Sequence, residues 1–483
     1  MSRILLLCIA ACATPLVPGG TIGAARKQPT LEVRLTTHLT SYSPAGSPFR
    51  CVVIRHLESN GKVVIPRGSV ISGSIQRAVP VGLGLIRERA TIKLTFTEYR
   101  TPDGQTFPLN AKLASIDNSR ERVTSSGQIR GVVSANDPNR FIFGVWMRPS
   151  MGQFSRSLIG LTGASNQLYS KFELGPISAV GFLAIRYTMF PFADPEIHLP
   201  PGTDMKLRVD VATPTGTEAA VSPAPSVSPE LADRLRQEPF STERLDGRPA
   251  PDIINVAFIG SEKDLLEAFS AAGWSRADPA TIRNYSRMYS AYNYMREYPS
   301  APVSTLLYQQ AGPALVFEKS LNNVAKRHHV RIWEAGSADG ETVWLGAATH
   351  DTGIGFNLRG ANFTHKIDPD IDKERTKVST DLVFGGCSQA PGRVEREHAT
   401  AAGSQNGLVT DGAVAVLELQ ACTPAADLDD DLPAPHQPGN KVTRFTRRFV
   451  LETRNYIVRE NLYYWGFRLV QYQWNQRASA KTE

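Results

Sequence analysis

Residues 326–351 read KRHHVRIWEAGSADGETVWLGAATHD, and this stretch decides how the second half of the chain folds. Its two ends, 326–334 and 343–351, are rich in β-branched, aromatic and small apolar residues, as strands are. Between them lie Gly336 and the pair Asp339-Gly340, which favour a hairpin connection. The stretch therefore predicts two antiparallel strands joined by a hairpin.

A register that sets Glu334 opposite Val343 divides the side chains of these strands between two faces. The apolar face, expected to form core, carries Val330, Ile332, Leu345 and Ala347. The other face carries Arg327, His329, Arg331 and Trp333, opposite His350, Ala348, Gly346 and Trp344. Basic side chains beside indoles fit a recess for a phosphate-type anion, and the predicted ligand-binding residues are Arg327, Arg331, Trp333 and Trp344. A slip of one residue would reverse these faces.

Three residues of the same strands are candidates for catalysis: His329, His350 and Asp351. An imidazole oriented by a carboxylate can act as a general base. Because neighbours on a strand point to opposite faces, His350 and Asp351 cannot pair with each other inside a strand. One of His328 and His329 must also point inwards, where a hydrogen-bonded core histidine is the alternative interpretation.

The acidic run THKIDPDIDKER at 364–375 has two interpretations. In the first, His365, Asp368 and Asp372 bind a divalent metal ion that activates water for phosphoester hydrolysis. In the second, Asp368 caps a helix whose first position is Pro369, and the acidic residues favour the helix N-terminus. This helix would form the surface pairs Asp370–Lys373 and Asp372–Arg375 and bury Ile371, Val378 and Leu382.

Upstream, the apolar run 253–259 is followed by Ser261 and Asp264, the start of a capped helix that ends in Ala271-Ala272-Gly273-Trp274. Together with the two strands and the acidic run, this segment resembles the LssY-like C-terminal domain over residues 249–382. The resemblance implies a lipid or envelope context, because the domain is often joined to membrane-embedded lipid phosphatase or DedA-like parts. It supplies no catalytic residue, since the signature motifs of the lipid phosphatases are missing from the sequence.

Residues 30–210 alternate apolar and polar positions between Pro/Gly turns, which predicts an all-β sandwich or small barrel. The motifs VIPRGS (64–69), TPDGQ (101–105) and LPPGT (199–203) resemble the β-domain of TrbI-type conjugal-transfer proteins. That resemblance implies an envelope scaffold without catalysis. A Pro/Ala/Ser-rich linker is expected at 211–248, followed by an α+β domain at 249–476.

The N-terminus predicts export. A basic residue, a short apolar run and small residues make up a signal peptide at 1–25, and the run is too short to span a bilayer. Two processing routes remain open: Ile9-Ala10-Ala11-Cys12 matches a lipobox that would leave a lipidated Cys12, and ordinary cleavage would follow Ala24 or Ala25. The mature protein is thus expected in the periplasm, either free or as a membrane-anchored lipoprotein.

Three cysteines lie beyond the signal peptide. An oxidising compartment would let Cys387 and Cys422 form a disulfide. Cys51 would then be a lone thiol, most often a small buried hydrophobe.

The net charge is +7, from 53 basic and 46 acidic residues spread along the chain. This small excess argues against a nucleic-acid binder and fits work near anionic head groups or, alternatively, a mildly basic surface without a role. The tail from Arg444 to Trp474 is basic and aromatic, which favours a membrane interface or a segment that covers the domain.

Two functions follow from the sequence. The first is an envelope binding or scaffold module that recognises an anionic phosphate or lipid head group. The alternative is a metal-assisted phosphoesterase on a lipid-linked or envelope substrate, whose cofactor would be a divalent metal ion. The sequence leaves open whether the protein is an enzyme.

Overall fold

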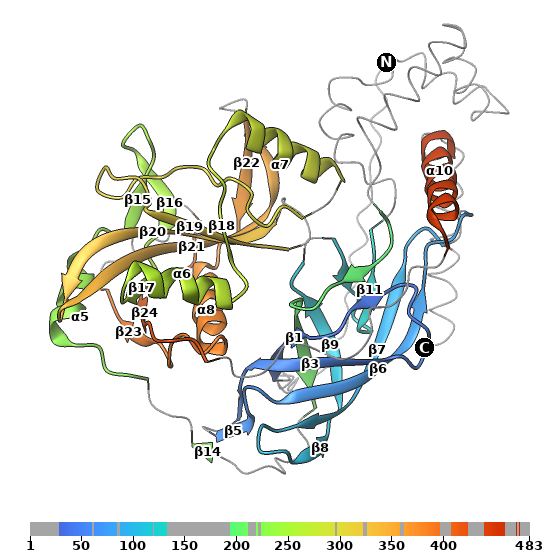
Figure 1. Ribbon diagram of the computed structural model, residues 1–483, viewed down its shortest axis with the longest axis horizontal. Helices are drawn as coiled ribbons and strands as arrows, with labels where there is room; N and C mark the ends of the chain where they lie inside the picture. The colour runs from blue at the N-terminus through green and yellow to red at the C-terminus, as the bar shows by residue number, and fades with distance from the viewer. Residues whose placement is uncertain are drawn as a thin grey trace, which may run out of the picture.

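A computed structural model of the chain (Figure 1) describes residues 29–59, 62–84, 87–118, 120–132, 194–210, 219–220, 224–294, 297–321, 326–357, 362–396, 407–423, 439–458, 470 and 473. The expected signal peptide, with Cys12, lies outside these residues. None of the helices in these ranges combines the length and the apolar character that a membrane-spanning helix needs.

The first domain is built on one nine-stranded antiparallel sheet. Along its path the strands are β10 (Arg122–Val123), β11 (Gln128–Arg130), β7 (Thr91–Arg100), β6 (Val70–Val79), β3 (Pro48–Arg55), β1 (Thr30–Leu35), β13 (Asp204–Val209) and β9 (Ala111–Ile116), and β8 (Thr106–Pro108) pairs with β7. The end strands β9 and β10 contact each other, so the sheet is nearly closed into a barrel. Two small sheets complete the domain: β2 (Leu39–Thr40) with β12 (His198–Leu199), and β4 (Leu57–Ser59) with β5 (Lys62–Ile65) and β14 (Ala219–Ala220).

The alternation seen in the sequence places one face of these strands in the core of the first domain. Phe49 and Phe96 meet edge to face there, with ring centroids 5.4 Å apart. Gly73 is required beside them, because a Cβ at that position would lie 2.5 Å from the Phe49 ring. Cys51 is a buried free thiol in the same core, as the sequence suggested.

The second domain has an eight-stranded mixed sheet. Its path is β18 (Ser275–Arg276), β19 (Leu315–Ser320), β20 (Arg327–Ala338), β21 (Glu341–Asn357), β17 (Val256–Ile259), β24 (Val414–Glu418) and β23 (Gly392–Val394), and β22 (Asn362–Ile367) pairs with β21. Only β17 and β24 run parallel among these pairs. A short hairpin of β15 (Ser241–Glu243) and β16 (Pro249–Ile253) and the helix α7 (Ile282–Tyr294) lie outside this sheet.

Helices cover both faces of this sheet. The helices α6 (Glu262–Ala271) and α8 (Ile371–Phe384) pack on one face through Leu265, Phe269 and Val378. The helix α5 (Pro229–Gln237) packs on the other through Leu231 and Leu235. The expected sequence of an all-β domain and an α+β domain is confirmed.

The helix α5 falls inside the expected linker at 211–248. Ser228 caps it by accepting a hydrogen bond from the backbone N–H of Leu231, and Pro229 occupies the first turn. The Ser-Pro sequence that suggested an extended linker is therefore a helix start, since proline is well suited to the first turn of a helix. The second domain begins before Pro249.

The hairpin of β20 and β21 forms with a register one residue away from the expected one. Glu334 lies opposite Trp344 rather than Val343, because a bulge between Glu334 and Ser337 shifts the pairing. Val330 and Ile332 consequently share a face with Ala348 and Gly346, not with Leu345 and Ala347. The other face of β20 pairs differently as well. Arg327, His329, Arg331 and Trp333 lie opposite Asp351, Thr349, Ala347 and Leu345, respectively.

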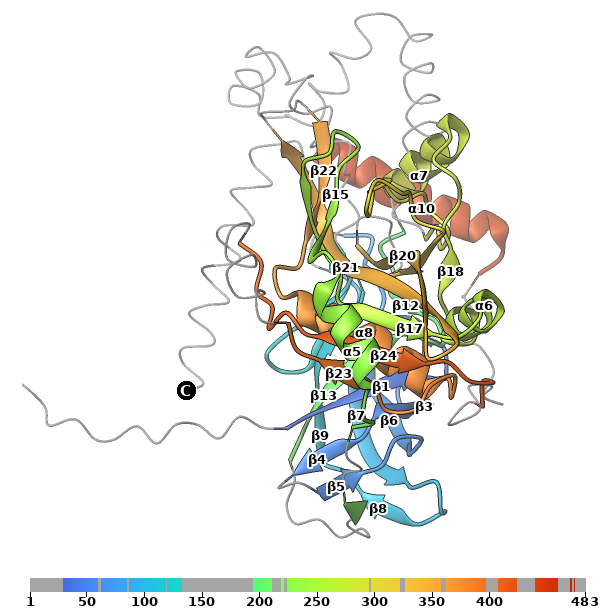
Figure 2. The ribbon, with the colours of Figure 1, turned by 90° about the vertical axis from the view of Figure 1, so that its left-hand side faces the viewer.

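The helix α8 connects the two domains. One side of it packs on the sheet of the second domain, and Phe384 near its end forms a small apolar cluster with Val52 and Ile54 of β3. Figures 1 and 2 show α8 between that sheet and the strands β1 and β3. The guanidinium of Arg34, on β1, lies over the Phe384 ring at 5.3 Å.

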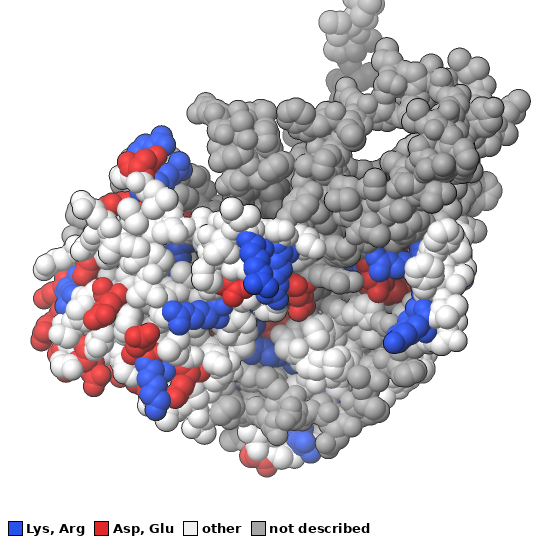
Figure 3. All heavy atoms as spheres, turned by 45° about the horizontal axis from the view of Figure 1, so that its top comes forward, with Lys and Arg blue, Asp and Glu red and all other residues white. Residues whose placement is uncertain are grey.

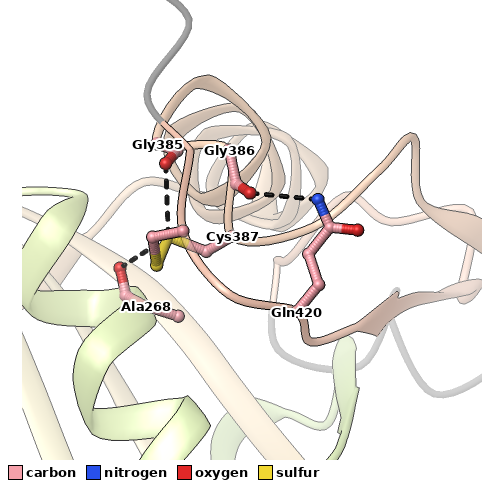
Figure 4. Close-up of a disulfide and its surroundings, with 6 residues drawn as sticks. Ala268, Gly385, Gly386, Cys387 and Gln420 are labelled. Atoms are coloured by element: carbon pink, nitrogen blue, oxygen red, sulfur yellow. Dashed lines mark hydrogen bonds between the residues drawn. A yellow bond between two sulfur atoms is a disulfide. The ribbon is translucent and has the colours of Figure 1, made fainter.

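Cys387 and Cys422 form the expected disulfide. Figure 4 shows the bond between the end of α8 and the chain near Gln420, beside α6. Gln420 donates a hydrogen bond to the Gly386 carbonyl in the same region. The bridge holds the C-terminal end of α8 to the segment that follows β24.

Candidate metal centre at the domain junction

A row of titratable side chains crosses the sheet of the second domain. Lys319 of β19 lies opposite His328 of β20, and His328 lies opposite His350 of β21. Residues directly opposite in neighbouring strands share a face. For this row it is the face on which α8 packs, so the row meets the charged residues of that helix.

His328 is held between two carboxylates from different parts of the fold. Its Nδ1 lies 2.7 Å from Oε2 of Glu374, in the first turn of α8. Its Nε2 lies 2.9 Å from Oδ2 of Asp117, which follows β9 in the first domain. Both contacts are made by a side chain that is 5% exposed, so His328 is a buried bridge between the domains.

His350 stacks on His328, with ring centroids 4.5 Å apart. Its Nε2 is buried and has no hydrogen-bond partner within the part of the chain that the structure describes. A buried polar atom without a partner is costly and therefore uncommon. The lone pair of this nitrogen is available to a ligand.

Asp117, His328 and His350 together form the one group of potential metal ligands found among the described residues, with ligand atoms all within 4.8 Å of one another. Two imidazoles and a carboxylate are ligands that Zn²⁺ accepts at about 2.0–2.2 Å, which for a tetrahedral site places the ligand atoms about 3.3 Å apart. Glu374 contacts the other ring nitrogen of His328, and a carboxylate in this place commonly orients a metal-bound imidazole.

The electrostatics of the two histidines differ. Burial alone would lower the pKa of His328, but Glu374 and Asp117 outweigh it and raise that pKa to about 10. Burial, reinforced by the charge of His328, lowers the pKa of His350 to about 4. Near neutral pH His350 is therefore an uncharged imidazole, the form that binds metals, whereas a metal ion at His328 would replace the Nε2 proton.

The expected anion recess does not form. Arg327 is buried and paired with Glu318 at 2.8 Å and with Asp351 at 3.2 Å. Arg331 is buried, pairs with Asp252, and donates to the Ser304 carbonyl at 2.9 Å. Internal carboxylates and carbonyls therefore occupy both guanidinium groups.

The tryptophans expected at this recess are also internal. Trp333 is 2% exposed and donates to the Ala311 carbonyl, and Trp344 is 4% exposed and donates to the Gly260 carbonyl. They lie on opposite faces of the sheet, in the clusters that α5 and α6 cover, respectively. Neither presents an indole face to a ligand.

The candidate catalytic residues separate between the two faces. His350 joins the metal group, whereas His329 and Asp351 lie on the other face, with His329 Nδ1 3.7 Å from Asp351 Oδ2. Nε2 of the same histidine lies 2.7 Å from Thr349 Oγ1, so a hydroxyl, an imidazole and a carboxylate follow one another. Because Thr349 is fully buried, no substrate reaches this arrangement and it is structural.

The acidic run forms the start of α8, as the second interpretation expected. The helix begins at Ile371 after the N-cap Asp370, two residues later than expected, and Asp368 accepts a hydrogen bond from the backbone N–H of Asp370. The carboxylate of Asp372 accepts from Thr410 and from the backbone of Asp411. The expected pairs Asp370–Lys373 and Asp372–Arg375 are present, but Arg375 is buried rather than on the surface. Ile371, Val378 and Leu382 are buried, as expected. The side chain of His365 lies outside the described part of the chain.

A cavity of about 320 Å³ lies between the domains and borders the metal group. Its lining includes Arg34, Asp117, Glu318 and Lys319. Of the three proposed ligands, Asp117 lines this cavity, and its side chain is 27% exposed. Burial and the neighbouring Arg34 lower the pKa of Lys319 to about 8, which allows its amine to exchange a proton near neutral pH.

Comparison with known proteins assigns the second domain. Residues 234–414 match the family model of the LssY C-terminus. The second domain is an LssY C-terminal domain. The match begins within α5, in agreement with the boundary seen in the fold. His328, His350 and Glu374 all belong to the LssY C-terminal domain, and Asp117 is contributed by the first domain.

One solved structure shows a weak similarity to the chain. Part of the chain is similar to ComB10 of the Com type IV secretion system of Helicobacter pylori, with 11% sequence identity over 38% of this chain and 85% of that chain and a TM-score of 0.19. No curated protein matches the chain.

Sequence reasoning missed two members of the site and assigned a third to the core. Asp117 lies 211 residues from His328, in a different domain from the LssY C-terminal domain, and no local pattern marks it. Glu374 lies in the acidic run at 364–375 together with three aspartates, and nothing in the sequence distinguishes it from them. The HH pair at 328–329 was the available signal, because alternation requires one of its histidines to face α8.

Proposed function

We propose that the protein binds a divalent transition-metal ion at the junction of its two domains and uses this ion to hold an anionic ligand of the cell envelope. The convergence of Asp117, His328 and His350, with Glu374 behind them, carries the proposal. Three protein ligands leave coordination positions for water or for an oxygen atom of a ligand.

The proposal accounts for how an anion would be attracted. Arg327 and Arg331 are neutralised by internal carboxylates, and Figure 3 shows basic and acidic side chains interspersed over the described surface of that view. A metal ion beside the cavity would therefore supply the positive charge that a phosphate or a phosphorylated head group requires.

The envelope context of this proposal has separate support. The N-terminal sequence has the parts of a signal peptide, and the disulfide between Cys387 and Cys422 suits an oxidising compartment. The second domain is an LssY C-terminal domain, whose resemblance led us to expect a lipid-related setting.

A metal-assisted phosphoesterase is the second candidate. A three-ligand site with an open position is the arrangement of catalytic zinc, in which the bound water becomes acidic enough to attack an ester. The cavity beside Asp117 also contains Lys319, whose lowered pKa suits proton transfer to a leaving group. The same three ligands serve both candidates.

The first experiment is a metal and ligand measurement on the full-length protein and on His350→Ala. We expect about one equivalent of Zn²⁺ per wild-type chain after loading and dialysis, and its loss in His350→Ala. His56→Ala is the matched control, because the side chain of His56 is 39% exposed and pairs with Glu58 away from the site. Equal metal content in all three proteins would overturn the proposal.

The same samples decide between the two candidates. Zinc-dependent binding of inorganic phosphate without turnover of a phosphomonoester supports the binding module. Turnover that disappears in His350→Ala supports the phosphoesterase. A protein that binds zinc but neither binds phosphate nor hydrolyses an ester contradicts the anionic-ligand part of the proposal.

A further inference from the structure

Arg396 differs from the other buried arginines in the part of the chain that the structure describes. Five arginines are buried there. Four of them pair with an aspartate or a glutamate: Arg34, Arg327, Arg331 and Arg375. Arg396 is 8% exposed and has only main-chain carbonyls and a phenyl ring as partners among the described residues. A buried charge without a counter-charge is costly, so a protein that keeps one commonly uses it.

Main-chain and ring contacts hold the guanidinium group of Arg396 in place. Its Nε donates to the Gly412 carbonyl at 3.0 Å, and its Nη2 donates to the Ile254 carbonyl at 2.5 Å. The group lies 4.8 Å from the centroid of the Phe240 ring, within the range of a cation–π contact. Gly412 and Ile254 lie just before β24 and β17, the parallel pair of the sheet. The guanidinium is therefore fixed against the ends of two core strands.

The second amine of the group, Nη1, has no hydrogen-bond partner within the described residues, although it is buried. Glu238 does not compensate the charge, because it accepts from the Tyr308 hydroxyl at 2.6 Å and lies 3.6 Å from Nε of Arg234. Burial lowers the pKa of Arg396 to about 10, so the group still carries its charge near neutral pH. Both a donor and a positive charge are left for a ligand.

A carboxylate matches this group better than a phosphate does. It carries one negative charge, which one guanidinium compensates, and its oxygens accept the N–H groups of Nη1. A phosphate dianion would bring a second negative charge next to a phenyl ring and into the neighbourhood of Glu238, where desolvation disfavours it. Since Arg396 is 8% exposed and Phe240 is half-buried, only a small ligand reaches the group.

We propose that Arg396 anchors a second ligand site, which binds the carboxylate of a small organic acid beside the Phe240 ring. This site is separate from the metal group. Glu238 caps the C-terminal end of α5, which packs on one face of the sheet, whereas the metal group lies on the face that α8 covers. The inference therefore does not depend on the proposed function.

Thermal unfolding of the full-length, metal-free protein tests the proposal with acetate as the probe. At matched ionic strength, acetate in place of chloride should raise the melting temperature of the wild type by about 2–4 °C once its concentration is well above Kd. The increase should disappear in Arg396→Gln, which removes the charge and keeps an amide donor for a neighbouring carbonyl. Arg236→Gln is the matched control, because Arg236 pairs with Asp233 on the exposed side of α5, and it should keep the full increase.

Arg396→Lys separates charge from geometry. It keeps the positive charge but lacks the planar pair of amines, so we expect the affinity for acetate to fall about tenfold. This variant also carries the test if Arg396→Gln does not fold. An equal effect of acetate on the wild type and the Arg396 variants would be a general salt effect and would overturn the proposal. An increase that depends on Arg396 with inorganic phosphate but not with acetate would overturn it too, because the site would then take another class of anion.

Discussion

Asp117 of the first domain accepts a hydrogen bond from His328 of the second, with Oδ2 and Nε2 2.9 Å apart. Because the pKa of His328 is raised to about 10, the imidazole is protonated near neutral pH and donates to Glu374 as well. The proposed metal site and the domain junction thus share a side chain. Substitutions at the contact between the domains should therefore change the affinity for the metal ion.

Asp117→Asn tests whether the metal site needs both domains. An amide is a poor ligand for Zn²⁺, so we expect the affinity for zinc to fall at least about tenfold while the domains stay folded. Competition with a chromogenic chelator measures this affinity. Asp210→Asn is the matched control, since Asp210 is an exposed aspartate of the same domain. An unchanged affinity in Asp117→Asn would remove Asp117 from the ligand set.

Glu374→Gln tests whether Glu374 orients His328 for metal binding. The side chain orients His328 through Nδ1 at 2.7 Å but is not itself a proposed ligand. Loss of such a partner commonly weakens metal affinity about 10- to 100-fold. We expect weaker binding with unchanged stoichiometry in the same competition assay. Loss of the metal altogether would instead make Glu374 a ligand.

Asp381→Asn should destabilise the domain junction. This fully buried carboxylate pairs with Arg34 at 2.8 Å, Lys319 at 3.0 Å and Lys377 at 2.8 Å. Removing its charge leaves buried cations without compensation, which typically costs about 3–5 kcal/mol. Urea unfolding measures the loss. Asp246→Asn, in an exposed pair with Arg248, should leave the unfolding midpoint unchanged; a similar shift in both variants would contradict a special role for Asp381.

The junction should weaken in acid. Burial alone would raise the pKa of Asp204, but Arg34 and Lys377 hold it well below its usual range, and Lys319 and Lys377 do the same for Asp381. A lowered folded pKa contributes stability that is present above the unfolded pKa of about 3.9 and is lost as the pH falls below it. We expect the free energy of unfolding to drop below about pH 4, with a smaller drop in Asp381→Asn. Parallel pH profiles for the two proteins would be inconsistent with this account.

Loss of the disulfide should destabilise the second domain. The bond between Cys387 and Cys422 spans 35 residues, and a bridge over a loop of this size contributes about 2–4 kcal/mol. We expect Cys387→Ser/Cys422→Ser to lower the melting temperature of the oxidised protein by the corresponding amount. Reducing agent should lower the wild type similarly and leave the variant unaffected. Cys51→Ser, at the buried free thiol, controls for loss of a cysteine. Because this variant keeps the bridge, reducing agent should lower its melting temperature as it lowers that of the wild type.

Local features of the second domain followed from the sequence. The hairpin, the cap at Ser261 and the buried face of α8 all rest on periodicity and on residues a few positions apart. The same reasoning failed on the strand register, because the bulge after Glu334 depends on how the connection packs. It also failed at Pro229, where a proline suits both a linker and a helix start.

The sequence by itself determined an all-β domain followed by an α+β domain and the capped helices, because the spacing of apolar, capping and turn residues along the chain encodes them. The pairing of Cys387 with Cys422 was an expectation from the number of cysteines beyond the signal peptide, and the structure forms it. Only the tertiary structure decided the chemistry of the polar residues of β20 and β21. Partners that are distant in sequence neutralise Arg327 and Arg331, whereas Asp117 reaches His328 across 211 residues. These long-range contacts decide which buried charges have a partner inside the protein and which polar atoms remain for a ligand. The reason is that the electrostatic cost of burying a group is set by every group packed near it.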